Sequence, residues 1–186
     1  AQQVEIEFEQ GEPVALDGVK LAPEDLVYKL EKMAGKHGVG RADTMENRIL
    51  GFKSREIYEA PAATVLYEAH HSLEQLTLDH ELHSYKPQMS SRYARCVYDS
   101  QWFSTLRQSL DAFFKECQQY VCGKVKMELY KGTARVIGRS SEFSIYDREK
   151  ANILKPGGIP SHNIEGYLEL RKLNQMTRAF RQKPKV

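Results

Sequence analysis

The pattern of apolar and polar positions predicts two β-hairpins with a series of helices between them. Residues 4–9 alternate apolar and acidic side chains, which is typical of a half-buried strand, and residues 13–16 can return beside them after a short turn. Residues 124–130 alternate in the same way, and residues 133–138 follow a Lys-Gly turn as their partner strand. Antiparallel strand pairs are therefore expected on both sides of the helical region.

Helical spacing of apolar residues predicts the other elements. The first helix is expected to begin at Pro23, whose fixed φ suits the first turn, and to end near Gly35 and Gly38. Further helices are expected over about 62–79, 89–99, 104–120 and 162–182, with Pro87 interrupting the chain before the third. The expected buried faces comprise Leu26, Val27, Leu30, Met33 and Ala34; Val65, Leu66, Ala69, Leu73 and Leu76; Tyr93, Cys96 and Val97; and Leu106, Leu110, Phe113, Phe114, Cys117 and Val121. Together these elements predict an α+β fold in which β-hairpins pack on helices.

The last predicted helix follows a Pro-Gly-Gly-Ile-Pro segment and carries an apolar stripe that something must cover. The stripe comprises Ile164, Leu168, Leu173, Met176 and Phe180. The helix can fold back on its own domain or dock on a neighbouring subunit, and the sequence leaves both arrangements open. We expect one domain over 1–155, followed over 156–186 by a linker and a C-terminal helical oligomerisation arm.

Between the first two predicted helices lies a dense polar segment, residues 38–61, in which little is patterned for a core. Such a segment is either a solvated connector or a loop that holds a polar small molecule. Loops on a rigid scaffold often carry function, so the second interpretation has consequences for chemistry.

Composition narrows the class of protein. The chain has 186 residues, of which 41% are hydrophobic and 28% charged, as in an ordinary globular domain. A net charge of +2 gives no reason to expect nucleic-acid binding, and no apolar run is long enough to span a membrane. The odd number of cysteines, three, argues against a disulfide framework and favours a reducing compartment such as the cytoplasm. The start at Ala1, without an initiator Met or a signal peptide, fits a processed chain or an excised fragment.

Most residues that resemble catalytic or binding motifs are better explained by a structural role. The glycines of residues 34–40 follow a helix rather than a strand and lack the Lys-Ser/Thr pair, so they are expected to be turn glycines and not a phosphate loop. His80 and His83 could share a helical face, but no cluster of further metal ligands accompanies them. No catalytic triad or nucleophile motif can be assembled from spacing. We therefore assign no catalytic, metal-binding or cofactor-binding residue from the pattern.

Glu46 and Tyr58 are the better candidates for a binding site. A carboxylate beside a phenol can hold the ammonium group of an amino-acid ligand through charge-assisted hydrogen bonds. The alternative makes residues 46–48 a helix cap with a local ion pair and Tyr58 a half-buried aromatic side chain. Lys53, Ser54 and Arg55 leave a similar choice between an anion contact and a solvated loop face.

At these residues the chain resembles argininosuccinate synthase. The family carries Ala-Gly-Lys-His-Gly-Val-Gly-Arg, Asp-x-x-Glu-Asn-Arg and Lys-Ser-Arg-x-x-Tyr-Glu-x-Pro, and this chain has the same residues at 34–41, 43–48 and 53–61. The similarity continues in the segments 66–70, 76–79, 130–132, 138–140 and 144–147. It departs from the family pattern at Thr44, Met45 and Glu142, and it is poor between residue 148 and Pro160.

The resemblance implies an ATP-dependent ligase of arginine biosynthesis and the urea cycle, which joins citrulline to aspartate and releases AMP and pyrophosphate. It also implies that Glu46 and Tyr58 bind citrulline, with Glu46 at the charged amino-acid end. The match covers the C-terminal part of the family, because the Ser-Gly-Gly-Leu-Asp-Thr pyrophosphate loop of its N-terminal domain does not occur here. This segment is therefore expected to bind no cofactor by itself and to lack ligase activity alone, whereas the complete enzyme uses ATP and Mg²⁺.

The expected partners are citrulline, the N-terminal nucleotide-binding domain and the other subunits of a cytoplasmic homotetramer, whose C-terminal helix extends onto neighbouring subunits. A different hypothesis is a free-standing, non-catalytic assembly or small-molecule-binding module on the same scaffold. A third hypothesis is nucleic-acid binding through the basic C-terminal end, but only a few arginine and lysine residues there favour it.

Overall fold

The computed structural model of the chain describes residues 1–151 and 160–182. These residues divide into two compact units, Ala1–Ile145 and Tyr146–Val186. The domain boundary expected between residues 155 and 156 lies outside the described residues, as does most of the Pro/Gly segment before the last helix.

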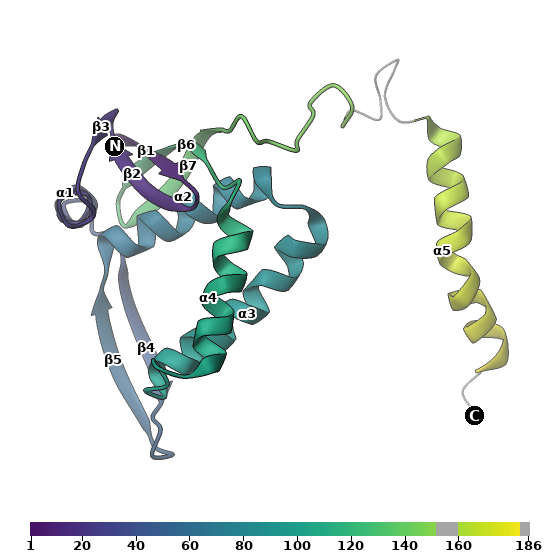
Figure 1. Cartoon of the computed structure of the whole chain (residues 1–186), viewed down its shortest axis with the longest axis horizontal. Helices are drawn as coiled ribbons and strands as arrows, with labels where there is room; N and C mark the ends of the chain where they lie inside the picture. Colours follow the sequence, from purple (N-terminus) through teal and green to yellow (C-terminus); the bar gives the residue numbers. More distant parts are fainter. Residues whose placement is uncertain (152–159, 183–186) are drawn as a thin grey trace. The chain divides into compact units, whose positions relative to one another are not determined.

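The first unit contains a five-stranded antiparallel sheet in the order β3-β2-β1-β6-β7 (Figure 1). Its strands are β1 (Gln2–Glu9), β2 (Glu12–Leu16), β3 (Val19–Lys20), β6 (Gly123–Tyr130) and β7 (Thr133–Ser140). Both predicted hairpins are confirmed. They join directly because β1 pairs with β6, which places Val4 opposite Met127 and Ile6 opposite Val125. The start of the chain thus lies at the centre of the sheet.

One face of the sheet forms the core with helices α1 (Pro23–Gly35) and α2 (Pro61–Thr77). Alternate residues of β1 and β6 point into it, whereas Glu5 and Glu7 on the other face pair with Lys126 and Lys124. The fully buried members include Val4, Ile6, Phe8, Leu26, Leu30, Val65, Leu73, Val125, Met127 and Leu129. Each such apolar side chain contributes roughly 1.5–3 kcal/mol by leaving water. The α+β fold predicted from the sequence is confirmed.

Helices α3 (His80–Tyr98) and α4 (Thr105–Gln118) form a second layer of packing. Tyr93 contacts the ring of Phe114 edge-on at 5.5 Å between centroids, and its hydroxyl donates to Asp111 at 2.9 Å. The prediction that Pro87 precedes the third helix is wrong, because Pro87 lies inside α3. Proline removes one backbone donor. Contacts on either side, such as the 2.9 Å ion pair of Lys86 with Glu74, hold the helix across that point.

The polar segment predicted as a loop or connector is a two-stranded antiparallel ribbon that projects from the rest of the unit (Figure 1). Its strands are β4 (Arg41–Asn47) and β5 (Lys53–Glu59). The interpretation of residues 46–48 as a helix cap is therefore wrong, although the local ion pair expected there is present between Arg48 and Glu46 at 3.5 Å. The pattern did not reveal these strands because both faces carry polar side chains, so the apolar alternation that marks a half-buried strand is missing.

Three residues predicted to be buried are exposed. Val27 lies at the edge of the Leu26–Leu30–Ala34 stripe and is 44% exposed. Val97 and Leu106 occupy the adjoining ends of α3 and α4, where the packing between the helices ends. The buried stripes are narrower and shorter than the apolar residues alone suggested.

The second unit contains helix α5 (Ser161–Arg181), which confirms the last predicted helix. Its apolar residues Leu168, Leu173, Met176 and Phe180 are exposed. Whether they dock on another subunit stays a prediction. Among the described residues, no helix is both long enough and apolar enough to cross a membrane.

Candidate functional site

The β4–β5 ribbon has two distinct polar faces, and the antiparallel register decides which residues share each face. Ala42 pairs with Tyr58, Thr44 with Glu56 and Glu46 with Ser54. Because paired residues of antiparallel strands point to the same side, these six side chains lie on one face, which we call the site face. The remaining strand residues point to the opposite face.

On the site face, long side chains meet above short ones. Tyr58 donates its hydroxyl hydrogen to Glu46 Oε1 at 2.6 Å, although the two residues lie four strand positions apart, or about 14 Å at 3.4 Å per residue. The side chains must therefore extend toward each other along the ribbon. The pair Thr44 and Glu56 lies between them on the same face.

A guanidinium reaches the same carboxylate from the tip of the ribbon. Arg48 Nη1 lies 3.5 Å from Glu46 Oε2 and 3.9 Å from Glu56 Oε1. Its backbone continues the ladder, because the Arg48 amide donates to the Phe52 carbonyl at 2.8 Å. The site face thus gathers two carboxylates, one guanidinium and one phenol, with a formal net charge of minus one.

Electrostatics keep the phenol a donor. The hydrogen bond to Glu46, followed by desolvation and the nearby negative charges of Glu46 and Glu56, raises the pKa of Tyr58 above its ordinary value of 10.0. A phenol is protonated at neutral pH already at its ordinary pKa, and the raised pKa keeps Tyr58 a donor to Glu46 up to a higher pH. The carboxylate retains lone pairs that can accept hydrogen bonds from a cationic ligand such as an ammonium group.

On the opposite face, the polar side chains pair with one another. Arg41 donates to Glu59 at 2.9 Å, Lys53 donates to Asn47 at 2.7 Å, and Arg55 donates to both carboxylate oxygens of Asp43. The hydrogen bonds from Arg55 hold the pKa of Asp43 below its ordinary range.

The run Lys53, Ser54 and Arg55, a candidate anion contact in the sequence, is therefore divided between the two faces. Lys53 and Arg55 are paired within the opposite face, and Ser54 lies beside Glu46. The Ser54 hydroxyl is buried and has no hydrogen-bond partner among the described residues. The sequence did not single out Glu56, whose place next to the Glu46 pair depends on the ribbon register.

The base of the ribbon is fixed to the helical body by a glycine turn. Gly40 has φ of +81°, and a Cβ there would lie 2.6 Å from the Ala60 carbonyl, so only glycine fits. The Ala60 amide donates to the Gly40 carbonyl at 2.9 Å, and Ala62, in the first turn of α2, donates its amide to Glu31 of α1. Gly38 and Gly40 are turn glycines with positive φ, as predicted, and Gly35 is the last residue of α1.

The histidines lie elsewhere. His71 and His83 bring their rings to 5.4 Å between α2 and α3, and His70 contacts Gln118 at 2.7 Å. Within residues 1–151 and 160–182, no group of three or more His, Cys, Asp or Glu side chains could hold a metal ion. All three cysteines are free thiols, and Cys96 and Cys117 are buried.

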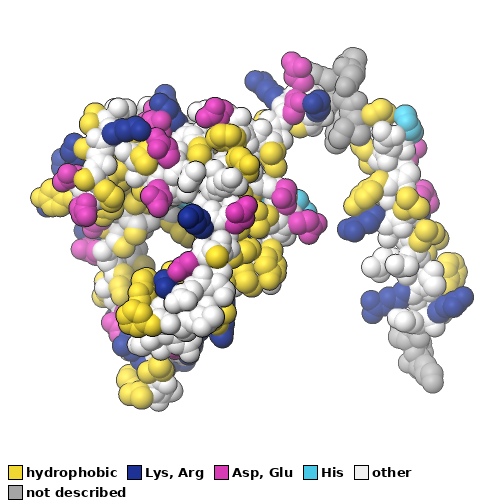
Figure 2. Space-filling model, in the orientation of Figure 1, with side chains coloured by type: hydrophobic (Ala, Val, Ile, Leu, Met, Phe, Trp, Pro, Cys, Tyr) yellow, Lys and Arg dark blue, Asp and Glu magenta, His cyan; other side chains and the backbone are white. Residues whose placement is uncertain are grey.

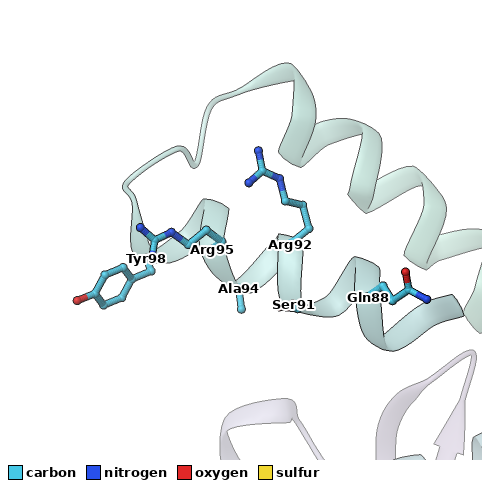
Figure 3. A pocket seen from close by; sticks show the side chains of 6 residues that line it. All are labelled: Gln88, Ser91, Arg92, Ala94, Arg95 and Tyr98. Carbon is cyan, nitrogen blue, oxygen red and sulfur yellow. The ribbon is translucent and has the colours of Figure 1, made fainter. Parts of the chain in front are cut away.

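A hollow of about 580 Å³ lies along α3, and the close view shows its lining side chains on that helix (Figure 3). Arg95 in this hollow is already tied to Asp99 at 2.7 Å and lies over the Tyr98 ring. The hollow therefore offers one side of a helix rather than converging polar groups. On the site face of the ribbon, by contrast, two carboxylates, a guanidinium and a phenol donor come together.

Comparison with known proteins points to one family. The sequence model of the family described as "Arginosuccinate synthase C-terminal domain" matches residues 1–178. Relatives named argininosuccinate synthase are 44% identical over 181 residues in Carboxydothermus hydrogenoformans and 47% identical over 167 residues in Bacillus subtilis. The matches cover 97% and 90% of this chain, but 45% and 41% of those relatives. The chain spans less than half the length of the curated relatives it matches.

Proposed function

This chain belongs to the argininosuccinate synthase family, in its C-terminal domain, and we propose that it supplies part of the citrulline site of such an enzyme. The reaction would be the ATP-dependent joining of citrulline to aspartate. The observation that carries the proposal is the 2.6 Å hydrogen bond from Tyr58 to Glu46. The two residues that the family motif assigns to citrulline are in contact on one face of a projecting ribbon.

The geometry suits the charged end of an amino acid. Glu46 presents a carboxylate whose side chain is 26% exposed, so a ligand ammonium can reach it while it remains fixed by Tyr58 and approached by Arg48. A hydrogen bond between two charged groups contributes about 1.5–3 kcal/mol. The ribbon can therefore bind and orient the amino acid, while the ureido end, which reacts, extends toward groups that another part of the enzyme must supply.

The described residues do not fit a nucleotide site at the glycine turn. The amides of His37, Gly38 and Val39 donate to carbonyls at the end of α1, so they are not free to receive a phosphate. We assign no step with ATP or Mg²⁺ to this domain. An N-terminal nucleotide-binding domain of the same protein would hold them.

Assembly as a homotetramer is part of the same proposal. Exposed apolar side chains along α5 support a role for this helix in contacts between subunits, because an amphipathic helix needs a partner for its apolar face. The three free thiols favour a reducing compartment such as the cytoplasm.

The test is citrulline dependence of the full-length gene product. Glu46→Gln keeps the shape of the side chain and removes its charge, so it should raise the KM for citrulline by about 10- to 150-fold and leave the KM for ATP nearly unchanged. Tyr58→Phe should raise it less, by about 2- to 12-fold, because it removes a single neutral donor.

Glu59→Gln is the matched control, since it removes the same charge from the opposite face of the same ribbon, on strand β5. It should leave citrulline dependence unchanged. An unaltered KM in Glu46→Gln would remove Glu46 from the site. If the full-length product has no ligase activity but binds citrulline, the alternative of a non-catalytic binding module on this scaffold is correct.

A further inference from the structure

Arg48 is placed between two carboxylates, and only one of them belongs to the proposed citrulline site. Its guanidinium nitrogen lies 3.5 Å from Glu46 Oε2 and 3.9 Å from Glu56 Oε1. Both distances are long for a charge-assisted hydrogen bond, which is usually 2.7–2.9 Å. Arg48 is therefore shared between the two carboxylates and fixed by neither.

A cation in this position competes with the ligand. An ammonium group that binds Glu46 needs the same carboxylate that Arg48 partly neutralises. Two cations beside a single carboxylate repel each other, so Arg48 would weaken binding if it had nowhere else to go. Glu56 gives it that place, because the Arg48 guanidinium nitrogen lies only a few tenths of an ångström farther from Glu56 than from Glu46.

Resting on the proposed function, we infer that Arg48 is an exchangeable internal cation of the citrulline site. In the absence of ligand it is shared by Glu46 and Glu56. When the citrulline ammonium arrives at Glu46, Arg48 moves fully to Glu56, so that each of the two carboxylates then faces one cation. Glu56 is thus a positioning residue that acts through Arg48 and sets the affinity for the amino-acid end of the substrate.

Exposure supports such a movement. The Arg48 side chain is 40% exposed and that of Glu56 is 37% exposed, so no packed core opposes a change of rotamer. Next to them, the buried Ser54 hydroxyl lacks a partner among the described residues and lies across the ladder from Glu46. The shift of Arg48 would leave Glu46 Oε2 to the ligand ammonium, with Ser54 as the neighbouring polar group.

The decisive experiment is a double-mutant cycle on the full-length gene product, with the Kd for citrulline measured by titration calorimetry. Glu56→Gln leaves Arg48 with Glu46 as its single partner, so the Kd should rise by about two- to fivefold, the range of an exposed ion pair. Arg48→Gln alone should change the Kd by less than about twofold, because Glu56 already relieves the competition. Adding Arg48→Gln to Glu56→Gln should restore the Kd to within about twofold of the parent.

The two effects on the Kd should not be additive, and this distinguishes the movement of Arg48 between carboxylates from a purely electrostatic effect of its charge. If Arg48 acted only by its charge, Arg48→Gln would lower the Kd by the same factor in both backgrounds, and that result would overturn the inference. A rise in Kd of more than about twofold in Arg48→Gln would also overturn it, because Arg48 would then hold Glu46 in place rather than compete for it.

Controls keep the inference distinct from the function on which it rests. Arg55→Gln removes an equal charge from the opposite face and should not rescue Glu56→Gln. Glu46→Gln tests the site itself. A strong loss of citrulline binding there, without rescue in the cycle, would reject the exchange alone. No loss in Glu46→Gln would reject the proposed function.

Discussion

The sheet with helices α1 and α2 and the β4–β5 ribbon are held together by different forces. Alternation in β1 and β6 buries one apolar side of the sheet, so Val4, Ile6 and Met127 are at most 2% exposed. In the ribbon, alternation separates two polar faces, and Met45 and Ile57 remain more than 60% exposed. The surface view shows hydrophobic side chains at the projecting tip of the ribbon (Figure 2).

This contrast explains where the candidate site lies. An isolated two-stranded ribbon is marginally stable, and its cross-strand pairs contribute only a few tenths of a kcal/mol to about 1 kcal/mol each. Charged groups that are exposed and lightly packed can meet a ligand without first breaking a core. The sheet and its helices supply rigidity at the base, where Gly40 and Ala60 join the ribbon to the body.

The largest expected difference between the two regions comes from deleting an apolar side chain in each. Leu30 is completely buried, so Leu30→Ala should lower the free energy of unfolding by about 3 to 4 kcal/mol through lost burial and a cavity. Ile57→Ala in the ribbon should change it by less than about 0.5 kcal/mol. Urea denaturation followed by circular dichroism measures both. Equal effects would show that the ribbon is packed as tightly as the core.

A somewhat smaller effect is expected for a buried charge. Glu74 is 4% exposed, forms an ion pair with Lys86 at 2.9 Å and accepts a hydrogen bond from Gln118 at 2.8 Å, which ties α2 to α3 and α4. Glu74→Ala should destabilise by about 2 to 3 kcal/mol, less than a fully buried pair because Lys86 keeps some contact with water. In the ribbon, Glu59→Ala removes the exposed partner of Arg41 and should cost less than about 1 kcal/mol.

Adding Lys86→Met to Glu74→Ala removes the cation left without its carboxylate, and should recover part of the lost stability in the same denaturation experiment. No recovery would mean that Gln118 or His70, rather than Lys86, carries the network.

The sequence predicted the core region well because burial leaves a periodic signal. The hairpins of β1–β2 and β6–β7 and the stripe of Leu26, Leu30 and Ala34 followed from spacing alone. The pairing of β1 with β6 did not, because long-range strand order is not written in local periodicity. Helix α3 was cut short in the prediction because Pro87 is a breaker locally, whereas contacts of Lys86 and Tyr93 with other helices override it.

The candidate site was predicted in part. Glu46 and Tyr58 were chosen for their chemistry and for a family motif, and the ribbon brings them together at 2.6 Å. The ribbon itself, the separation of Lys53 and Arg55 from Ser54, and the place of Glu56 depend on cross-strand register. The cross-strand register is weakly specified where both faces are polar, so it could not be predicted from the spacing of residues in the sequence.

A smaller test concerns the phenol on the site face. The pKa of Tyr58 is raised mainly by its hydrogen bond to Glu46, so its stabilising contribution is complete below the unfolded value near 10 and is lost as pH rises through the raised folded value. The difference in ultraviolet titration between the parent and Tyr58→Phe isolates this one phenol among ten tyrosines. It should titrate above pH 10 and return to the ordinary range in Glu46→Gln. An unshifted phenol in the parent would contradict the contact.

The smallest expected effect on stability lies on the opposite face of the ribbon. There the pKa shift has the opposite sign to that of Tyr58. Hydrogen bonds from Arg55 lower the pKa of Asp43 below 3.8, so its contribution is complete above that unfolded value and is lost as pH falls through the lowered folded value. Carboxyl-carbon NMR should show Asp43 titrating below pH 3.8, and Arg55→Gln should return it to the ordinary range. Because both side chains are more than half exposed, solvent screens the pair, and the same substitution should leave the unfolding midpoint at neutral pH almost unchanged. A large loss of stability in Arg55→Gln would instead place this ion pair among the forces that hold the ribbon together, and the contrast with the buried core would then be one of degree.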